Sequence, residues 1–390
     1  MQVPLAALFF FAILTLWVPG YWPVTVFQVG IFALAAIAVW RARLSPPAFV
    51  WPIVPLTSAL VLGIFQWLTG RTAYAFDTRL AILRWATFLS VFLIGISVFR
   101  DRAAHRWFRS AILWFACLVS ILATIQTFTS HGRIFWLFDA PYVAGYVMGP
   151  ILYRNHYAAF IEAVLPIALY LAVRRERDSL LYSGMAAIMY ASVVACSSRA
   201  GTVLTTCEVV LVPLLLWAQR RAPARTVAVT LLRMGLLFAL FTLVVGWDSV
   251  WSRFWMPDPM AVRRELALST VRMAASHPWF GTGLGTWASV YPRYAVFDIG
   301  LFANQAHNEW LQWTAEGGLP LGVMLATLFF WSLRPAFRSV WGLGVVAVFL
   351  HAIVDYPFSR PALGAWAIVI LSLLAVTGAK SQDSESPERP

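Results

Sequence analysis

The sequence predicts an all-α polytopic membrane protein, on the evidence of its composition, its long apolar stretches and the alternating charge of its loops. Hydrophobic residues make up 61% of the 390-residue chain and charged residues 12%, against roughly 45–50% and about 25% in soluble domains. A soluble fold of this composition would lack the polar residues needed to cover its surface. The net charge is +12, but the basic residues do not cluster as nucleic-acid binding requires, so no nucleic acid partner is expected.

Apolar stretches long enough to cross a bilayer, which takes about 20 residues, predict about twelve transmembrane helices. They lie near 3–19, 22–40, 48–69, 80–99, 108–127, 157–173, 179–196, 202–218, 226–247, 308–333, 340–355 and 361–379. The first stretch has no basic segment before it and no small-residue cleavage site after it, so we expect a retained span rather than a signal peptide. Cys117, Cys196 and Cys207 fall within apolar stretches and are expected to be core thiols.

The orientation follows from the arginines, which occupy every second short loop. Basic residues are retained on the cytoplasmic side, so these loops and both termini are predicted to be cytoplasmic. The polar tail 380–390 is predicted to be disordered there, and loops 128–156 and 248–307 then face outward. The loop arginines are Arg41, Arg43, Arg100, Arg102, Arg106, Arg109, Arg174, Arg175, Arg177, Arg220, Arg221, Arg225, Arg334 and Arg338.

Loop 248–307 is too long for a simple connector, since loops beyond about 12–15 residues are usually functional or disordered. Its many aromatic residues argue against disorder and predict a structured element on the outer face. The stretch 263–276 has helical spacing and is expected to place four residues on one face: Leu266, Thr270, Met273 and Ala274. The aromatic residues are Trp251, Phe254, Trp255, Trp279, Phe280, Trp287, Tyr291 and Tyr294.

Two polar groups precede this loop on the outward side. The segment 153–157, which contains Arg154 and His156, fits either an interfacial anchor at headgroup level or the rim of a substrate cavity. Arg199 lies in the turn 197–201 between two spans. It either snorkels to the interface or faces a cavity, where the small residues around it would let an anion approach.

Two further groups belong to the large loop. Arg263 and Arg264 suit a pyrophosphate, because guanidinium groups bind phosphate oxygens bidentately and stay charged. The Gly-x-Gly-x-Gly segment 281–285 is not a P-loop, since no Lys-Ser/Thr follows it. His307 marks the re-entry into the membrane, either as an interfacial histidine or as a base that accepts a proton from a hydroxyl. The scattered histidines have no metal-site spacing, so no metal is expected.

Ionisable residues inside membrane spans are costly to bury, so each one is a candidate functional residue. Arg84, Glu162 and Glu208 lie deep in predicted spans and could pair with one another. Asp355 lies close enough to the outer face to be hydrated.

These four groups, taken in order along the chain, resemble the O-antigen ligase/polymerase family of bacterial envelope glycosyltransferases. The resemblance rests on Arg-Asn-His at 154–156, Ser-Arg-Ala-Gly at 198–201, the stretch from Arg263 to Gly285 with its His-Pro-Trp-Phe-Gly-Thr-Gly-Leu-Gly core, and Ala-His-Asn-Glu-Trp-Leu at 306–311. It covers roughly 145–325, while the first 140 residues match in hydropathy alone.

The resemblance implies a GT-C-type fold in the bacterial inner membrane. It divides the chain into N-terminal transmembrane helices (1–140), a ligase-like core (141–325), C-terminal transmembrane helices (326–379) and the tail (380–390). The implied donor is a glycan on undecaprenyl pyrophosphate, transferred at the periplasmic face without metal or cofactor. The implied acceptor is lipid A–core for a ligase, a growing polysaccharide for a polymerase, or a protein hydroxyl.

Carried over by position, Arg199 matches the family's arginine in the turn, Arg263 matches the arginine that opens the loop helix, and His307 matches the histidine ahead of the re-entering span. Two arginines could stabilise the pyrophosphate without a metal, and His307 is the best-placed base. The family often has tryptophan four residues after the loop arginine, whereas this chain has Ala267, so Arg264 remains an alternative to Arg263. Four further residues are expected to line the substrate cavity: Arg154, His156, Asn308 and Glu309. Asn308 and Glu309 could also fix the tautomer of His307.

A transporter or flippase for lipid-linked oligosaccharide would also have about twelve spans, but it would be expected to show internal repeats and charges at the midplane. The concentration of polar residues in the outward loops favours chemistry at one face instead. The third alternative is a non-catalytic protein of envelope assembly. In each case the chain is expected to be surrounded by membrane lipids.

Overall fold

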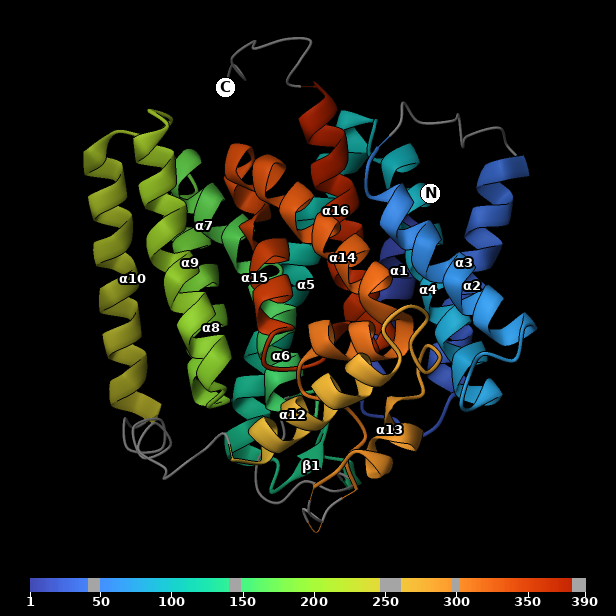
Figure 1. The fold of residues 1–390 in the computed structure, drawn as a ribbon. Coiled ribbons are helices and arrows are strands. Elements are labelled where there is room, and N and C mark those ends of the chain that lie inside the picture. Colours follow the sequence, from blue (N-terminus) through green and yellow to red (C-terminus); the bar gives the residue numbers. More distant parts are fainter. Residues whose placement is uncertain (41–49, 140–148, 246–260, 297–299, 301, 381–390) are drawn as a thin grey trace.

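The computed structural model describes residues 1–40, 50–139, 149–245, 261–296, 300 and 302–380. Within these ranges the chain is almost entirely helical (Figure 1). Arg41, Arg43, Trp251, Phe254, Trp255 and the tail from 381, which the sequence analysis names, lie outside the described residues.

Seven helical segments of the described chain are long and apolar enough to cross a membrane. The predicted span 157–173 is divided into two helices by a break before Pro166. The seven segments are α2 (Trp22–Trp40), α4 (Ala75–Val98), α5 (Arg102–Thr129), α6 with α7 (Arg154–Glu162 and Leu165–Arg174), α9 (Arg199–Ala218), α10 (Ala224–Val245) and α14 (Glu309–Arg338).

Five shorter apolar helices lie at the positions of the other predicted spans. The chain is therefore an all-α polytopic membrane protein, as predicted, whereas a total of twelve spans stays a prediction. These five are α1 (Gln2–Leu14), α3 (Ile53–Leu68), α8 (Ser179–Ala195), η2 with α15 (Val340–Gly342 and Leu343–His351) and α16 (Pro361–Lys380).

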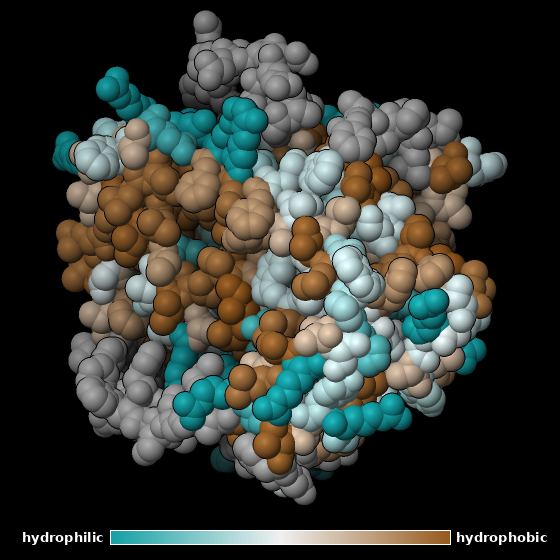
Figure 2. Space-filling model, viewed as in Figure 1, coloured by the Kyte–Doolittle hydropathy of each residue, from teal (hydrophilic) through white to brown (hydrophobic). Residues whose placement is uncertain are grey.

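The C-terminal helix α16 forms the centre of the bundle. Its residues from Ala362 to Val376 are buried, and Trp366 packs edge-on against Phe9 of α1, with ring centroids 5.9 Å apart. In contrast, α10 lies at the periphery and exposes Leu232, Leu236 and Leu240. Figure 2 shows hydrophobic residues covering the middle of the molecule over α8–α10, between hydrophilic residues at the two ends. This distribution matches a protein that is surrounded by lipid.

The loops predicted to face outward gather at one end of the bundle, with α12 and α13 (Figure 1). The end of α16 and the start of α10 lie at the opposite end. There the arginine-rich loops contact one another, since Arg174 donates to the backbone carbonyl of Arg221, and Arg221 donates to that of Arg338 at 2.6 Å. The grouping of loops therefore agrees with the predicted alternation.

The large loop folds around a small core of its own. It contains α12 (Ala261–Ser276), α13 (Trp287–Val290) and η1 (Tyr291–Arg293). Leu266 and Met273 are buried against Trp287, whose indole N–H donates to Thr270 Oγ1 at 2.9 Å. The predicted helix over 263–276 and its buried face are confirmed.

The loop docks onto a kink in α14 at Gly318, where φ is 77° and ψ is 171°. A Cβ atom at Gly318 would lie 2.4 Å from the carbonyl oxygen of Trp279, so the kink requires glycine. The following amide of Leu319 donates to the carbonyl of Pro278 at 2.7 Å. The large loop is therefore packed against α14 at this kink.

Two details of the described residues were not predicted. Loop 128–156 contains a short antiparallel ribbon of β1 (Arg133–Ile134) and β2 (Phe138–Asp139), in which Arg133 pairs with Asp139. Cys117 and Cys196 are buried free thiols as predicted, but Cys207 is exposed. The prediction of a core position for Cys207 is wrong, because this residue is exposed on the surface of α9.

Candidate active site

The starts of α6 and α9 are joined by hydrogen bonds. Ser198 caps α9 by accepting from the amide of Gly201 at 3.2 Å, and its hydroxyl donates to Asn155 Oδ1 at 2.8 Å. The thiol of Cys196 lies 3.6 Å from the carbonyl oxygen of Arg154. Two of the four polar groups predicted from the sequence therefore form one unit.

Arg199 occupies the first position of α9 and is partly exposed. The free amides of a helix N-terminus carry partial positive charge, which adds to that of the guanidinium. Ser197, two residues earlier, has a left-handed backbone with φ of 55°, a conformation that costs energy for a non-glycine residue. Arg154, on α6, is exposed.

His307 also has a left-handed backbone, with φ of 52°, and its neighbours hold it in that conformation. The amide of Ala306 donates to Gln312 Oε1 at 3.0 Å. Asn308 caps α14 by accepting from the amide of Leu311 at 3.0 Å. The chain on both sides of the imidazole is therefore fixed to the first turn of α14.

Glu309 connects this turn to the loop 352–359. Its amide donates to the carbonyl of Ala352 at 2.8 Å, and its buried carboxylate accepts from the amide of Phe358 at 2.9 Å. Arg84 of α4 donates to the carbonyl of Ser359 at 3.1 Å. These bonds place the loop 352–359 beside His307.

Asp355, on that loop, faces the imidazole. Its Oδ1 lies 3.6 Å from Nδ1 of His307, an ion-pair distance. The Asp355 side chain is 1% exposed and the His307 side chain is 24% exposed. Burial by itself would raise the pKa of Asp355, but the interaction with His307 and the attraction of His156, His351 and His307 outweigh it and lower that pKa below its usual value. Asp355 is thus a carboxylate next to the predicted base.

An aromatic wall surrounds the pair. The Tyr356 ring centroid lies 4.9 Å from that of His307, 4.8 Å from that of His156 and 5.9 Å from that of Tyr153. The guanidinium of Arg360 lies 5.9 Å from the same ring. Predicted residues His156 and His307 are therefore brought together by Tyr356, a residue that the sequence analysis did not select.

The start of α12 supplies Arg263. The pKa of the Tyr153 phenol is raised by burial and by Asp355, and Arg263, which interacts with the hydroxyl, partly offsets that rise. Arg263 is half-buried, whereas Arg264 is exposed. The structure thus places Arg263 against the side chains around His307. Among the described residues, no contact joins the Arg199 side chain to Arg263 or His307.

The Gly-x-Gly-x-Gly segment has its amides occupied within the protein. The carboxylate of Glu316 accepts from the amides of Gly285 at 2.8 Å and Trp287 at 3.2 Å. Gln66 of α3 accepts from the amide of Leu284 at 2.9 Å. The segment therefore attaches the large loop to α14 and α3, and these three amides are not available to a phosphate.

Buried ionisable residues in the spans pair differently from the prediction. Glu162 of α6 lies 2.8 Å from Nδ1 of His351 on α15, with both side chains fully buried. Arg84 interacts with the loop 352–359 instead, and the carboxylate of Glu208 has no hydrogen-bond partner among the described residues. The predicted mutual pairing of Arg84, Glu162 and Glu208 is therefore wrong, because Glu162 faces α15.

Sequence reasoning missed Asp355 as a partner of His307, although it noted the residue near the outer face. The available signal was an acidic residue next to a tyrosine at the outward end of a predicted span. Together the site offers a histidine with a carboxylate 3.6 Å from its Nδ1, an aromatic wall and a half-buried arginine, with a second arginine at a helix N-terminus. Such an arrangement can deprotonate a hydroxyl and stabilise developing negative charge.

Comparison with known proteins gives one match. Residues 184–326 match the family model described as O-Antigen ligase. This segment includes Arg199, Arg263 and His307, whereas Tyr153, His156 and Asp355 lie outside it. No curated protein matches the chain. The matched segment coincides with most of the predicted core and supports the predicted resemblance to the O-antigen ligase family.

Proposed function

We propose that this protein transfers a glycan from undecaprenyl pyrophosphate to an acceptor hydroxyl at the periplasmic face of the bacterial inner membrane. The match of residues 184–326 to the O-antigen ligase family model supports a ligase or polymerase in general terms. The observation that carries the specific proposal is the His307–Asp355 pair, 3.6 Å apart, beside a half-buried Arg263. The end of the bundle with α12 and α13 would then be periplasmic.

In this proposal Arg199 and Arg263 bind the pyrophosphate of the donor. The charge that develops on the leaving group must be stabilised, and preorganised guanidinium groups can do so without a metal. The N-terminus of α9 adds its partial positive charge next to Arg199. Arg154, which is exposed at the start of α6, could meet the same anion.

The transfer itself exchanges one bond at the anomeric carbon for another. The acceptor oxygen forms the new bond, the bond from the anomeric carbon to the pyrophosphate oxygen breaks, and undecaprenyl pyrophosphate leaves with the electron pair. The acceptor proton passes to Nε2 of His307. Asp355 keeps a proton on Nδ1, which faces it, and stabilises the imidazolium that forms.

Asn308 and Glu309, predicted as cavity residues, support this chemistry by a different route. Asn308 caps α14 and Glu309 bonds to the loop that carries Asp355. We propose that they orient the base and its carboxylate, while His156 and Tyr356 form the wall against which the acceptor lies.

The test is a transfer assay with purified protein in lipid nanodiscs and a defined undecaprenyl-pyrophosphate-linked glycan. One arm offers lipid A–core as the acceptor and the other offers a second copy of the lipid-linked glycan. Transfer to lipid A–core supports a ligase, which we favour, and elongation of the glycan supports a polymerase. Transfer should persist in the presence of a metal chelator. Absence of transfer in both arms with folded protein would overturn the proposal.

A further inference from the structure

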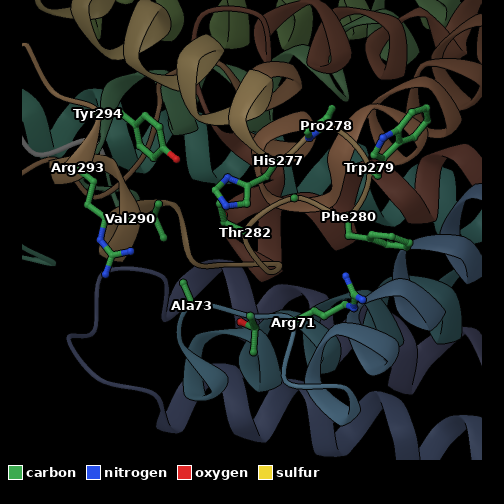
Figure 3. A pocket seen from close by; sticks show the side chains of 12 residues that line it. Arg71, Ala73, His277, Pro278, Trp279, Phe280, Thr282, Val290, Arg293 and Tyr294 are labelled. Carbon is green, nitrogen blue, oxygen red and sulfur yellow. The ribbon is translucent and has the colours of Figure 1, made fainter.

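A cavity lies at the far end of α12 from the His307 site. It measures about 480 Å³ and is lined by residues 71–73 after α3, residues 277–282 after α12, and Val290, Arg293 and Tyr294 (Figure 3). Arg263 is near the start of α12 and His277 follows its end, so a helical rise of 1.5 Å per residue separates them by roughly 20 Å. The cavity is therefore distinct from the candidate active site.

The cavity is lined by basic side chains. Arg71 and Arg293 lie on either side of His277 (Figure 3), and no aspartate or glutamate is among the lining residues. Within the described chain neither arginine forms an ion pair, and both are exposed. The nearby Glu316 is already occupied by the amides of Gly285 and Trp287. The charge of this cavity therefore suits an anion.

Aromatic rings stand beside these charges. Trp279 is 69% exposed and Phe280 is 44% exposed, and the Arg71 guanidinium lies 5.3 Å from the Phe280 ring centroid. An aromatic ring gives a flat apolar surface at low cost in conformational entropy. A pyranose sugar presents a C–H face that can lie on such a ring, while its carboxylate or phosphate substituent meets a guanidinium. The combination therefore suits an anionic sugar better than a simple inorganic anion.

The walls of the cavity are held by the protein before any ligand binds. The amide of Ala73 donates to the carbonyl of Thr282 at 2.8 Å, and the amide of Gly281 donates to that of His277 at 3.0 Å. Gln66 donates to the carbonyl of Phe280 at 2.6 Å. A ligand would thus bind without first having to order the lining segments, which favours affinity.

We propose that this cavity binds an anionic saccharide, a sugar that carries a carboxylate or phosphate group. It would hold part of a glycan at a distance from the His307 site, where the new glycosidic bond forms. This assignment rests on the proposed function for its reason to bind sugars, but it makes a separate claim about binding. The anionic sugar could come from a soluble glycan chain or from the headgroup of a glycolipid.

Two probes separate these sources and need no transfer reaction. Isothermal titration calorimetry of the full-length protein in detergent compares hexagalacturonate, which carries a carboxylate on every sugar, with neutral maltohexaose. Native mass spectrometry compares retention of lipid A, a phosphorylated glycolipid, with that of phosphatidylglycerol. Binding of hexagalacturonate supports an extended acidic chain as the ligand. Retention of lipid A alone supports a glycolipid headgroup.

The variants Arg71→Gln and Arg293→Gln should each weaken the bound probe about tenfold, as expected for loss of a charge-assisted hydrogen bond. Arg272→Gln is the matched control, because Arg272 is an exposed arginine on α12, the helix that leads to His277, and lies outside the lining. It should change the affinity less than twofold. All three side chains are exposed, so the melting temperatures should match that of the parent.

The His307→Gln protein separates this inference from the proposed function, since it should bind the probe as the parent does even when transfer is lost. The inference is overturned if neither anionic probe binds, or if the neutral control ligand binds equally well. It is also overturned if the Arg71→Gln/Arg293→Gln double variant retains the affinity of the parent, or if Arg272→Gln loses as much.

Discussion

His307 and Asp355 face each other across 3.6 Å, although one precedes α14 and the other follows α15. Glu309 makes this relationship possible, since its amide and its carboxylate both bond to the loop 352–359. The pair resembles the arrangement in which a carboxylate fixes the tautomer of a catalytic histidine. The predictions below address this pair, the arginines and the orientation of the chain.

Replacement of Asp355 by asparagine should lower the transfer rate by about 10²-fold or more, because an amide cannot stabilise the imidazolium of His307. Donor binding should be nearly unchanged, since Arg199 and Arg263 are intact. The matched control is Asp139→Asn, which alters an aspartate with a 93% exposed side chain at the same end of the molecule. If Asp355→Asn transfers at the rate of Asp139→Asn, Asp355 has no role in orienting the base.

The stability of the protein should depend on pH through Asp355. Its pKa is lowered in the folded state, so the ionised carboxylate stabilises the fold at pH values above the ordinary aspartate pKa of about 3.9. That contribution is lost as the pH falls through the lowered folded value. The difference in melting temperature between parent and Asp355→Asn should therefore be smaller below about pH 4 than at pH 5. A difference that grows in acid would contradict this assignment.

Arg263 and Arg264 are neighbours with different environments, so lysine substitutions should separate them. Arg263→Lys should lose most of the transfer activity, because a lysine keeps the charge but not the bidentate geometry. Arg264→Lys should remain close to the parent, since Arg264 is exposed. Arg199→Lys should behave like Arg263→Lys. Initial rates at limiting donor measure the effect, and full activity of Arg263→Lys and Arg199→Lys would remove the pyrophosphate assignment.

The orientation of the chain can be measured with introduced cysteines in a Cys207→Ser background, where the remaining thiols are buried. Ser276→Cys, at the exposed end of α12, should label with an impermeant maleimide in intact spheroplasts. Glu176→Cys, in an exposed arginine-rich loop at the opposite end, should label only after lysis. The reverse pattern would place the candidate site in the cytoplasm.

Much of the fold could be predicted because membrane insertion depends on local hydrophobicity. Each predicted span coincides with a described helix or pair of helices, and α12 was predicted from the spacing of residues such as Leu266 and Met273. Both patterns are properties of a short stretch of chain. The same holds for Arg199, whose place in a turn between two apolar stretches fixes it at the start of a helix.

The partners of the polar residues could not be predicted, because they depend on packing between distant helices. Nothing local connects Glu162 with His351, or His307 with Asp355. The Gly-x-Gly-x-Gly segment was equally ambiguous, since its amides could meet a phosphate or a carboxylate of the protein. Glu316 occupies two of them, since its carboxylate accepts from the amide of Gly285 and its backbone carbonyl accepts from that of Gly283.

The central claim is that His307 accepts the proton of the acceptor hydroxyl, and the most direct measurement is the transfer rate of purified His307→Gln. Glutamine keeps a hydrogen-bonding side chain at this position but cannot take up a proton. The rate should fall about 10²–10⁴-fold, as is usual for loss of a general base, with an unchanged melting temperature and unchanged donor binding. A folded His307→Gln protein that transfers glycan at the parent rate would contradict the claim.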